Sequence, residues 1–341
     1  MRIVSSAPGK LILAGEHSVV YSEPALATAI DLRTTCEIET DISQDQKLIF
    51  VDFHSFNITN IIIRYYGDKF HAELLSKSTG HSHQVQNSIK AIVFCLNQVG
   101  IKQPLSMRIS VSSSIPVGCG LGSSAAFSVS LSAAIMQLSG CYEVCLQDLA
   151  DSVEHIFHEN PSGIDTFVSQ HGGLVEFQKN TGSGTKFLSK NVEINEEVRG
   201  ILVQIVNTNV TRSTKSMVSK VRKNYEKNPE FINHCCKAIT SLVAEIRTKL
   251  KSGEIEQLDT ALEQNHQMLN AIGVGHSSLD FAHDLARNKY NIVLKTTGAG
   301  GGGCMFSLKS LPKELVQELN LKEFSTFRTS ILAPGLNVDV S

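Results

Sequence analysis

One glycine-rich segment constrains this chain more than any other: the run Pro116-Val-Gly-Cys-Gly-Leu-Gly-Ser-Ser-Ala-Ala126, between an expected strand and an alanine-rich expected helix. Gly118, Gly120 and Gly122 let backbone N–H groups approach an anion closely, and the N-terminus of the following helix adds free donors and a positive dipole end. The segment is not a Walker A loop, because two serines follow Gly122 in place of Lys-Ser or Lys-Thr. A tight turn with serine caps is the alternative interpretation.

A second segment, Lys295 to Gly303, follows an expected strand and holds five glycines in the six residues 298–303. Packing alone does not explain so large a cost in backbone entropy. A backbone that wraps closely around a phosphoryl group or around another loop does require such glycines. A flexible linker is the alternative, and the apolar alternation that resumes at Cys304 counts against it.

The chain opens with Ala7-Pro-Gly-Lys-Leu-Ile-Leu-Ala-Gly-Glu-His17, an apolar run with Lys10 near its start and Glu16 and His17 at its end. Charged groups at both ends of an otherwise buried strand are ordinarily no more than solvated strand ends. On this segment alone, we favour that interpretation over a functional one.

Composition excludes several classes of function. The 341 residues include 31 basic and 33 acidic side chains, so the formal net charge of -2 gives no overall positive footprint for nucleic acid or an anionic membrane. The sequence shows no secretion signal and no run of 18 apolar residues. Its eight cysteines are scattered without zinc-like spacing, which suits buried thiols in a reducing compartment. We therefore expect a cytoplasmic protein.

A metal cluster of His155, His158 and Glu159 is conceivable from their spacing. The sequence that leads to Asn160-Pro161 looks like a helix end, and histidines in a core or on a surface are commoner than ligands. We do not expect these histidines to bind a metal.

Apolar spacing predicts a mixture of strands and helices. Extended stretches are expected within residues 2–56 and at 105–111, 174–177, 191–208, 292–295 and 329–340, with a turn at 180–186. Helices are expected at 84–99, 123–138, 146–158, 215–224, 229–251, 255–270, 277–288 and 312–320. The chain is longer than one compact core usually is, and the helical pattern dominates after residue 191. Two domains are therefore predicted, one of residues 1–190 joined by 328–341, and one of residues 191–327.

In their order along the chain and in their residues, the three segments resemble the three motifs of the GHMP kinases, the superfamily of galacto-, homoserine, mevalonate and phosphomevalonate kinases. Within it the likeness is strongest to the mevalonate kinase family and extends to the segments 160–165, 171–173 and 270–280. Glu159 and Thr211 depart from the glycine and proline that are common in the family. The resemblance implies a two-domain α+β fold with the active site in the cleft between the domains.

The resemblance also implies an ATP-dependent phosphotransferase that acts on the C5 hydroxyl of mevalonate, in isoprenoid and sterol biosynthesis. ATP would be bound by the loop residues Pro116, Gly118, Gly120, Leu121, Gly122, Ser123, Ser124 and Ala125, and the third motif would be formed by Gly298, Ala299, Gly300 and Gly301. Ser124 and Glu154 would hold Mg²⁺, a cation that prefers hard oxygen ligands.

By the same resemblance, Asp165 matches the family's catalytic aspartate and would take the proton of the C5 hydroxyl, while Lys10 would lower the pKa of that hydroxyl and contact the γ-phosphate. An Asx turn or cap is the alternative for Asp165. The positions that match the family's substrate-binding residues are Glu16, His17, Arg212 and Thr214. Arg212 suits a substrate carboxylate because a guanidinium fork fits a planar anion. The alternative, that Arg212 is an ordinary exposed arginine beside the start of a helix, is given equal weight.

Two alternatives stay open. Another kinase of the superfamily, such as a phosphomevalonate kinase, would want an added basic cluster for its extra phosphate, and the sequence shows none near the matched substrate positions. A non-catalytic relative that senses nucleotide or metabolite is the second alternative. The joint presence of Lys10, Ser124, Glu154 and Asp165 counts against it. Homodimers are common in the family, so a homodimer is expected here.

Overall fold

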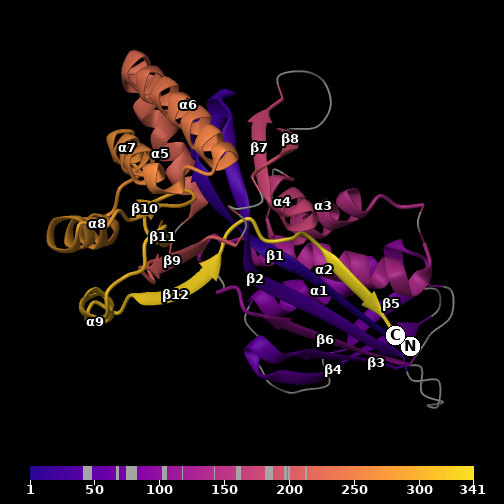
Figure 1. Ribbon diagram of the computed structural model, residues 1–341. Coiled ribbons are helices and arrows are strands. Elements are labelled where there is room, and N and C mark those ends of the chain that lie inside the picture. The colour runs from indigo at the N-terminus through magenta and orange to yellow at the C-terminus, as the bar shows by residue number, and fades with distance from the viewer. Residues whose placement is uncertain are drawn as a thin grey trace.

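The computed structural model describes residues 1–40, 48–66, 69–73, 83–101, 106–116, 118–141, 143–158, 163–180, 187–195, 198, 200–211 and 213–341. Helices and strands both occur along the chain, which confirms the α+β class expected from the sequence. They form two groups, each built around its own β-sheet (Figure 1).

The larger sheet has nine strands, and a path through it runs β13-β1-β2-β6-β3-β4-β5. β2 is long enough to pair with β6 along its second half and with β7 along its first, and β7 pairs in turn with β8. All pairs are antiparallel except β3 with β6. The bounds are β1 Arg2–Ala14, β2 Ala25–Thr40, β3 Leu48–Phe53, β4 Ile58–Tyr66, β5 Lys69–Glu73, β6 Met107–Ser113, β7 Leu174–Lys179, β8 Phe187–Val192 and β13 Asn337–Val340.

Four helices accompany this sheet: α1 His83–Gln98, α2 Ser123–Ser139, α3 Leu146–Phe157 and α4 Ile164–His171. α2 is buried along most of its length because it lies against β1 and β2 and is flanked by α3 and α4. A helix that is apolar on all sides is stable only in such a position. Since α2 begins where the first glycine-rich segment ends, its packing against β1 holds that segment beside Lys10.

The second sheet has the antiparallel order β10-β11-β9-β12. Its strands are β9 Leu202–Asn207, β10 Lys295–Thr296, β11 Cys304–Ser307 and β12 Ser325–Ser330, and its helices are α5 Thr214–Lys227, α6 Pro229–Ser252, α7 Leu258–Ala271, α8 Ser277–Tyr290 and α9 Lys313–Asn320. Three short 3-10 turns complete the described elements: η1 Ser18–Tyr21, η2 His54–Phe56 and η4 Ile255–Gln257.

The two groups are joined by a common core and by the end of the chain. β13 returns from the second group to pair with β1, with Val340 opposite Ile3 (Figure 1). One apolar cluster combines side chains from both groups, among them Leu11, Leu13, Ile205, Ile239 and Phe306. The division into domains at residues 190 and 327 stays a prediction.

Each expected helix is confirmed within a few residues of its predicted bounds, except that residues 255–257 form η4 before α7 begins. Two expectations were wrong. The stretch 191–208 is not continuously extended, because β8 ends at Val192 and β9 begins at Leu202. Of residues 292–295, Lys295 alone lies in a strand. It forms β10 together with Thr296, and β10 pairs with β11. The expected turn at 180–186 lies outside the described residues except for Asn180.

α4 is an element that the sequence pattern did not predict. Gly163 has φ of 76° and stands at its N-terminus, so Asp165 lies in the first turn of a helix and not in a loop. At the N-terminus of α8, the ring of His276 is the capping group and accepts from the N–H of Ser278.

Two further features concern the apolar character of the helices and the state of the cysteines. Within the ranges given above, no helix has the length and apolar character to cross a membrane. The eight cysteines are free thiols, and six of them are buried, as expected, while Cys141 is half-buried and Cys145 is exposed.

Candidate active site

A cavity of about 620 Å³ collects residues from both groups of elements. The predicted site residues that line it are Lys10, Glu16, His17, Pro116, Gly118, Gly120, Leu121, Gly122, Ser123, Ser124, Asp165, Thr214, Gly298 and Ala299. The three glycine-containing segments of the sequence therefore meet at one place, although they are far apart along the chain.

The first glycine-rich segment packs directly on β1. Gly122 has φ of 79°, and a Cβ atom added there would lie 2.9 Å from Cγ of Lys10. The N–H of Lys10 donates to the carbonyl of Leu121 at 2.8 Å. The N-terminus of α2 has no side-chain cap, so its first N–H groups are available to an anion in the cavity. The serine caps considered from the sequence are absent from this helix end.

Lys10 and Asp165 form an ion pair, with 3.3 Å between Nζ and Oδ1. The Lys10 side chain is 8% exposed and that of Asp165 is 40% exposed, so the ammonium is held by its surroundings while the carboxylate faces the cavity. A carboxylate that can accept a proton, beside an ammonium that can stabilise an oxyanion, is the pair that proton transfer from an alcohol requires.

Glu154 of α3 lies beneath the cavity. Its two carboxylate oxygens accept hydrogen bonds from the hydroxyls of Ser124, at 2.7 Å, and Ser128, at 3.0 Å. Burial raises the pKa of Glu154 to about 8, and the negative charge of Asp165 contributes to the increase, while the two serine hydrogen bonds oppose it. A buried carboxylate with a raised pKa is a group that would be stabilised by a nearby cation.

His158, which follows α3, stands beside this pair. Its Nε2 is 3.3 Å from Oγ of Ser124 and 3.4 Å from the Glu154 carboxylate, and the ring lines the cavity. In the part of the chain that the structure describes, no group of three or more His, Cys, Asp or Glu side chains is placed to hold a metal. Glu159 and Asn160 lie outside the described residues.

Glu16 and His17 also line the cavity and closely follow β1. Nε2 of His17 is hydrogen-bonded to the carbonyl of Ala299 at 2.8 Å, which ties the opening segment to the second glycine-rich segment. Thr214 lines the cavity from the first turn of α5, whose N-terminus is capped by Ser213. Arg212 lies outside the described residues.

Four predicted site residues among those that the structure describes do not line the cavity. Glu154 lies behind the lining residue Ser124, whose hydroxyl donates a hydrogen bond to it. Ala125 is buried in the protein interior. Gly300 and Gly301 contact a neighbouring loop, since a Cβ added at Gly300 would lie 2.4 Å from the carbonyl of Val274, and the N–H of Gly301 donates to that same carbonyl at 2.8 Å. This part of the glycine run thus serves close contact between loops, one of the two uses expected from the sequence.

Several cavity residues were missed by the sequence analysis. Four polar residues of α1 line it, namely His83, Gln84, Asn87 and Ser88, together with Ser55 and Phe56 of η2. Asn87 and Ser88 are buried polar side chains on an otherwise amphipathic helix, and that combination was the available signal. Lys295 was also missed: it forms a fully buried ion pair with Glu16. A lysine just before a glycine run was its signal.

The chain is similar to known proteins in sequence and in fold. Residues 87–173 match the family described as GHMP kinases N terminal domain. The mevalonate kinase of Pyrococcus horikoshii is 33% identical, over 99% of this chain and 98% of its own length, and that of Mus musculus is 31% identical, over 98% and 94%. The crystal structure of L. major mevalonate kinase in complex with R-mevalonate has a TM-score of 0.76 to this chain, at 21% identity, over 97% of this chain and 96% of that one.

The structural likeness supports the fold, and the sequence likeness goes further. An identity above 30% is maintained over almost the full length of this chain and of the relatives, and the residues that meet in the cavity belong to the matched segments. The chain therefore belongs to the mevalonate kinase family of the GHMP kinases.

Proposed function

We propose that this chain transfers the γ-phosphate of ATP to the C5 hydroxyl of (R)-mevalonate, giving 5-phosphomevalonate and ADP for isoprenoid biosynthesis. The observation that carries the proposal is the Lys10–Asp165 ion pair, which lies in one cavity with the uncapped N-terminus of α2. A relative that only sensed a metabolite would need the anion site but not the proton-handling pair. The relatives named mevalonate kinase support mevalonate as the alcohol.

In the proposed reaction, the C5 oxygen forms a bond to the γ-phosphorus while its proton passes to the carboxylate of Asp165. The bond between the γ-phosphorus and the oxygen that bridges to the β-phosphate breaks, and ADP leaves with that oxygen. The ammonium of Lys10, 3.3 Å from Asp165, stabilises negative charge on the reacting oxygens. The N–H groups at the start of α2 and the loop before it bind the phosphates.

We propose Ser124 and Glu154 as the protein ligands of Mg²⁺. A hydroxyl and a carboxylate are the hard oxygen donors that this cation prefers, and it usually takes its other ligands from water and phosphate, so two protein ligands suffice. The raised pKa of Glu154 fits the assignment because a cation beside the carboxylate would relieve the cost of its burial. When bound, the ion would neutralise charge on the phosphate oxygens.

For the substrate, we propose Glu16, His17 and Thr214 as contacts from the cavity wall. Arg212 is proposed to bind the carboxylate of mevalonate, on the strength of its match to the family and of the bidentate geometry of a guanidinium. A cytoplasmic homodimer is proposed for the assembly, and sedimentation of the purified protein would test its subunit count.

A coupled assay of ADP release tests the function. Purified protein with Mg-ATP is compared on mevalonate, phosphomevalonate, homoserine and galactose. We expect kcat/KM for mevalonate to exceed that for phosphomevalonate at least about a hundredfold, because the extra phosphate would meet no added basic group. Preference for phosphomevalonate, or turnover of none of the four alcohols, contradicts the proposal.

A further inference from the structure

A buried ion pair lies immediately behind the substrate end of the cavity. Lys295 of β10 and Glu16, which follows β1, are joined between Nζ and Oε1, and neither side chain is exposed beyond 1%. Glu16 is among the residues that line the cavity, and Lys295 is not. Any influence of Lys295 on a substrate is therefore exerted through Glu16.

Lys295 belongs to a segment whose alternate residues all contact the end of β1. Two residues further on, the hydroxyl of Thr297 is hydrogen-bonded to the backbone of Ile12. Two residues beyond that, the carbonyl of Ala299 meets His17. The side chains of Lys295 and Thr297, two residues apart, therefore both point toward β1 and the residues that follow it.

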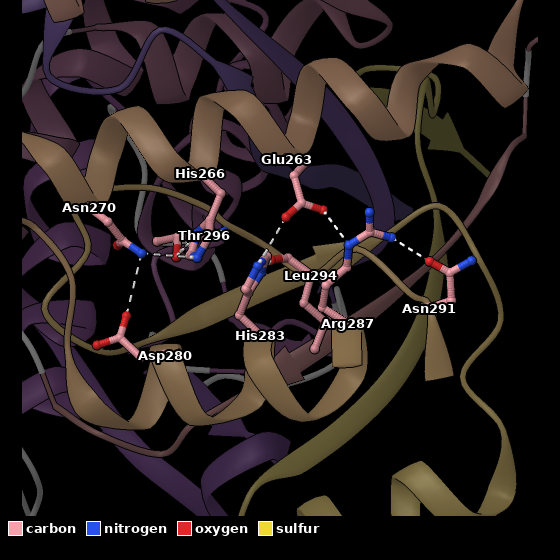
Figure 2. A network of polar contacts seen from close by, with 9 residues as sticks. All are labelled: Glu263, His266, Asn270, Asp280, His283, Arg287, Asn291, Leu294 and Thr296. Atoms are coloured by element: carbon pink, nitrogen blue, oxygen red, sulfur yellow. Dashed lines mark hydrogen bonds and ion pairs between the residues drawn. The ribbon is translucent and has the colours of Figure 1, made fainter. Parts of the chain in front are cut away.

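Thr296, between Lys295 and Thr297, faces the opposite way, into a network on α7 and α8 (Figure 2). The hydroxyl of Thr296 is hydrogen-bonded to Nδ1 of His266 at 3.2 Å, and Nδ1 of His283 donates to the carbonyl of Leu294 at 2.9 Å. The two rings stack with 4.3 Å between their centroids. The backbone that carries Lys295 is thus anchored on both sides, which restricts the position of its ammonium.

The charges around the pair leave Lys295 as the cationic partner of Glu16. Burial lowers the pKa of His266 to about 3, and the nearby His283 and Lys295 add to the decrease, so His266 is neutral. Burial also lowers the pKa of Lys295, and the Glu16 carboxylate opposes that decrease. The ring of Phe306, with its centroid 5.7 Å from Nζ, adds a favourable contact for the ammonium.

One atom of the pair has no partner. Oε2 of Glu16 is buried and makes no hydrogen bond to the residues that the structure describes, whereas Oε1 is bonded to Lys295. A buried carboxylate oxygen without a donor is costly, and such atoms are commonly completed by a bound group. Glu16 lines the cavity, so a ligand that enters it lies close to this buried oxygen, and a small rotation of the carboxylate brings the two into contact.

We propose that Lys295 is a positioning residue for the alcohol substrate, holding Glu16 in one orientation so that its second oxygen accepts a hydrogen bond from a substrate hydroxyl. This inference rests on the proposed function for the identity of the alcohol. The role is distinct from that of Lys10, whose ammonium lies at the reacting end of the cavity beside Asp165.

Steady-state kinetics of Lys295→Met test the role, because methionine keeps much of the side-chain volume but removes the charge. We expect KM for mevalonate to rise at least about tenfold, the effect of losing one hydrogen bond to a charged group, while KM for ATP changes less than about twofold. Lys249→Met is the matched control, since it removes an ion pair with Glu245 within α6, away from the cavity residues. Both KM values should stay at wild-type levels in that variant.

Loss of Lys295 also leaves the buried charge of Glu16 unpaired and lowers stability. A second variant therefore distinguishes the effect on substrate binding from the effect on folding. In Glu16→Gln with Lys295→Met both charges are gone, and the melting temperature should recover toward that of the wild type while KM for mevalonate stays raised. A folded variant of either kind with wild-type KM for mevalonate, or with KM for ATP raised by the same factor, overturns the inference. Wild-type turnover of mevalonate, measured first in the same assay, tests the proposed function separately.

Discussion

The hydroxyl of Thr297 is hydrogen-bonded to both backbone groups of Ile12: it accepts from the N–H and donates to the carbonyl, each at 3.1 Å. One side chain of the second glycine-rich segment thereby satisfies two polar groups of β1 that lack a partner strand on that side. Ile12 is two residues from Lys10 on the same strand, so this contact helps to fix the position of the Lys10 ammonium.

Thr297→Val should destabilise the fold by about 1 to 3 kcal/mol, because it keeps the shape of the side chain but leaves the two backbone groups of Ile12 unsatisfied. Urea unfolding of the two proteins measures the difference. Thr248→Val is the control, since the hydroxyl of Thr248 bonds the carbonyl of Ala244 on the exposed face of α6, and its loss should cost within about 0.5 kcal/mol. Equal losses in the two variants would show that the Ile12 contact contributes nothing specific.

Asp165→Asn should lower kcat by about 10² to 10⁴-fold with little change in melting temperature or in ATP affinity. Asparagine preserves the size of the side chain but cannot accept the proton of the alcohol. Single-turnover phosphate transfer together with a melting curve separates the two interpretations of this residue. A large fall in melting temperature with a modest loss of rate would favour a purely structural role at the start of α4.

Lys10→Met combined with Asp165→Asn should lose less activity than the product of the two single losses. The two groups are 3.3 Å apart and are proposed to act in one charge system, so removing the second costs little once the first is gone. The measurement is a double-mutant cycle on kcat. Losses that multiply in full are the result that the shared role does not allow.

Glu154→Gln should lower the rate and shift the Mg²⁺ dependence to higher concentration, because an amide is a weaker ligand than a carboxylate. Activity is titrated with Mg²⁺ at saturating ATP. The matched control is Glu176→Gln, which alters a carboxylate that is paired with Lys190 and Arg247 and does not line the cavity. An unchanged titration in Glu154→Gln, at full activity, would remove this residue from the site.

The buried His266 should make stability depend on pH. Its pKa is about 3 in the folded protein against 6.5 for an unperturbed histidine, so the unfolded chain binds a proton that the folded chain does not, and folding weakens as the pH falls below 6.5. Between pH 7.5 and 5.5 the wild type should lose about 1.4 kcal/mol more than His266→Gln, which has no such group. Urea unfolding at the two pH values gives the comparison. Equal pH dependence in both proteins would mean that His266 titrates normally.

Much of the fold could be predicted because local patterns encode it. The apolar period over residues 229–251 predicted α6 within one residue, and the helix from Ser123 followed from its alanine-rich run. The pattern over 292–295 was misread for a physical reason: Ile292, Val293 and Leu294 are buried by surrounding helices and strands without joining a ladder, and burial alone looks like a strand in sequence.

Residues of the candidate site were predictable where a motif carried them, and not where a tertiary contact did. Ser124 stood in a glycine run that already indicated an anion site, and Lys10 and Asp165 were predicted from the resemblance to the GHMP kinase motifs. The pairing of Lys295 with Glu16 depends on how two sheets meet, and no period in the sequence encodes it. The polar residues of α1 were hidden in the same way, because a helical pattern indicates which face is apolar but not which cavity its polar face borders.

The separation of Glu16 from Lys295 has a consequence for how the protein is made. Glu16 leaves the ribosome 279 residues before its partner, which at 5 to 20 residues per second is roughly 15 to 60 seconds. During that interval the carboxylate has no lysine to pair with and must stay hydrated, so the cavity wall that it forms cannot close. The cavity wall formed by Glu16 is therefore completed only once β10 has been synthesised, and a nascent chain that stops before β10 holds the first glycine-rich segment but not the finished cavity.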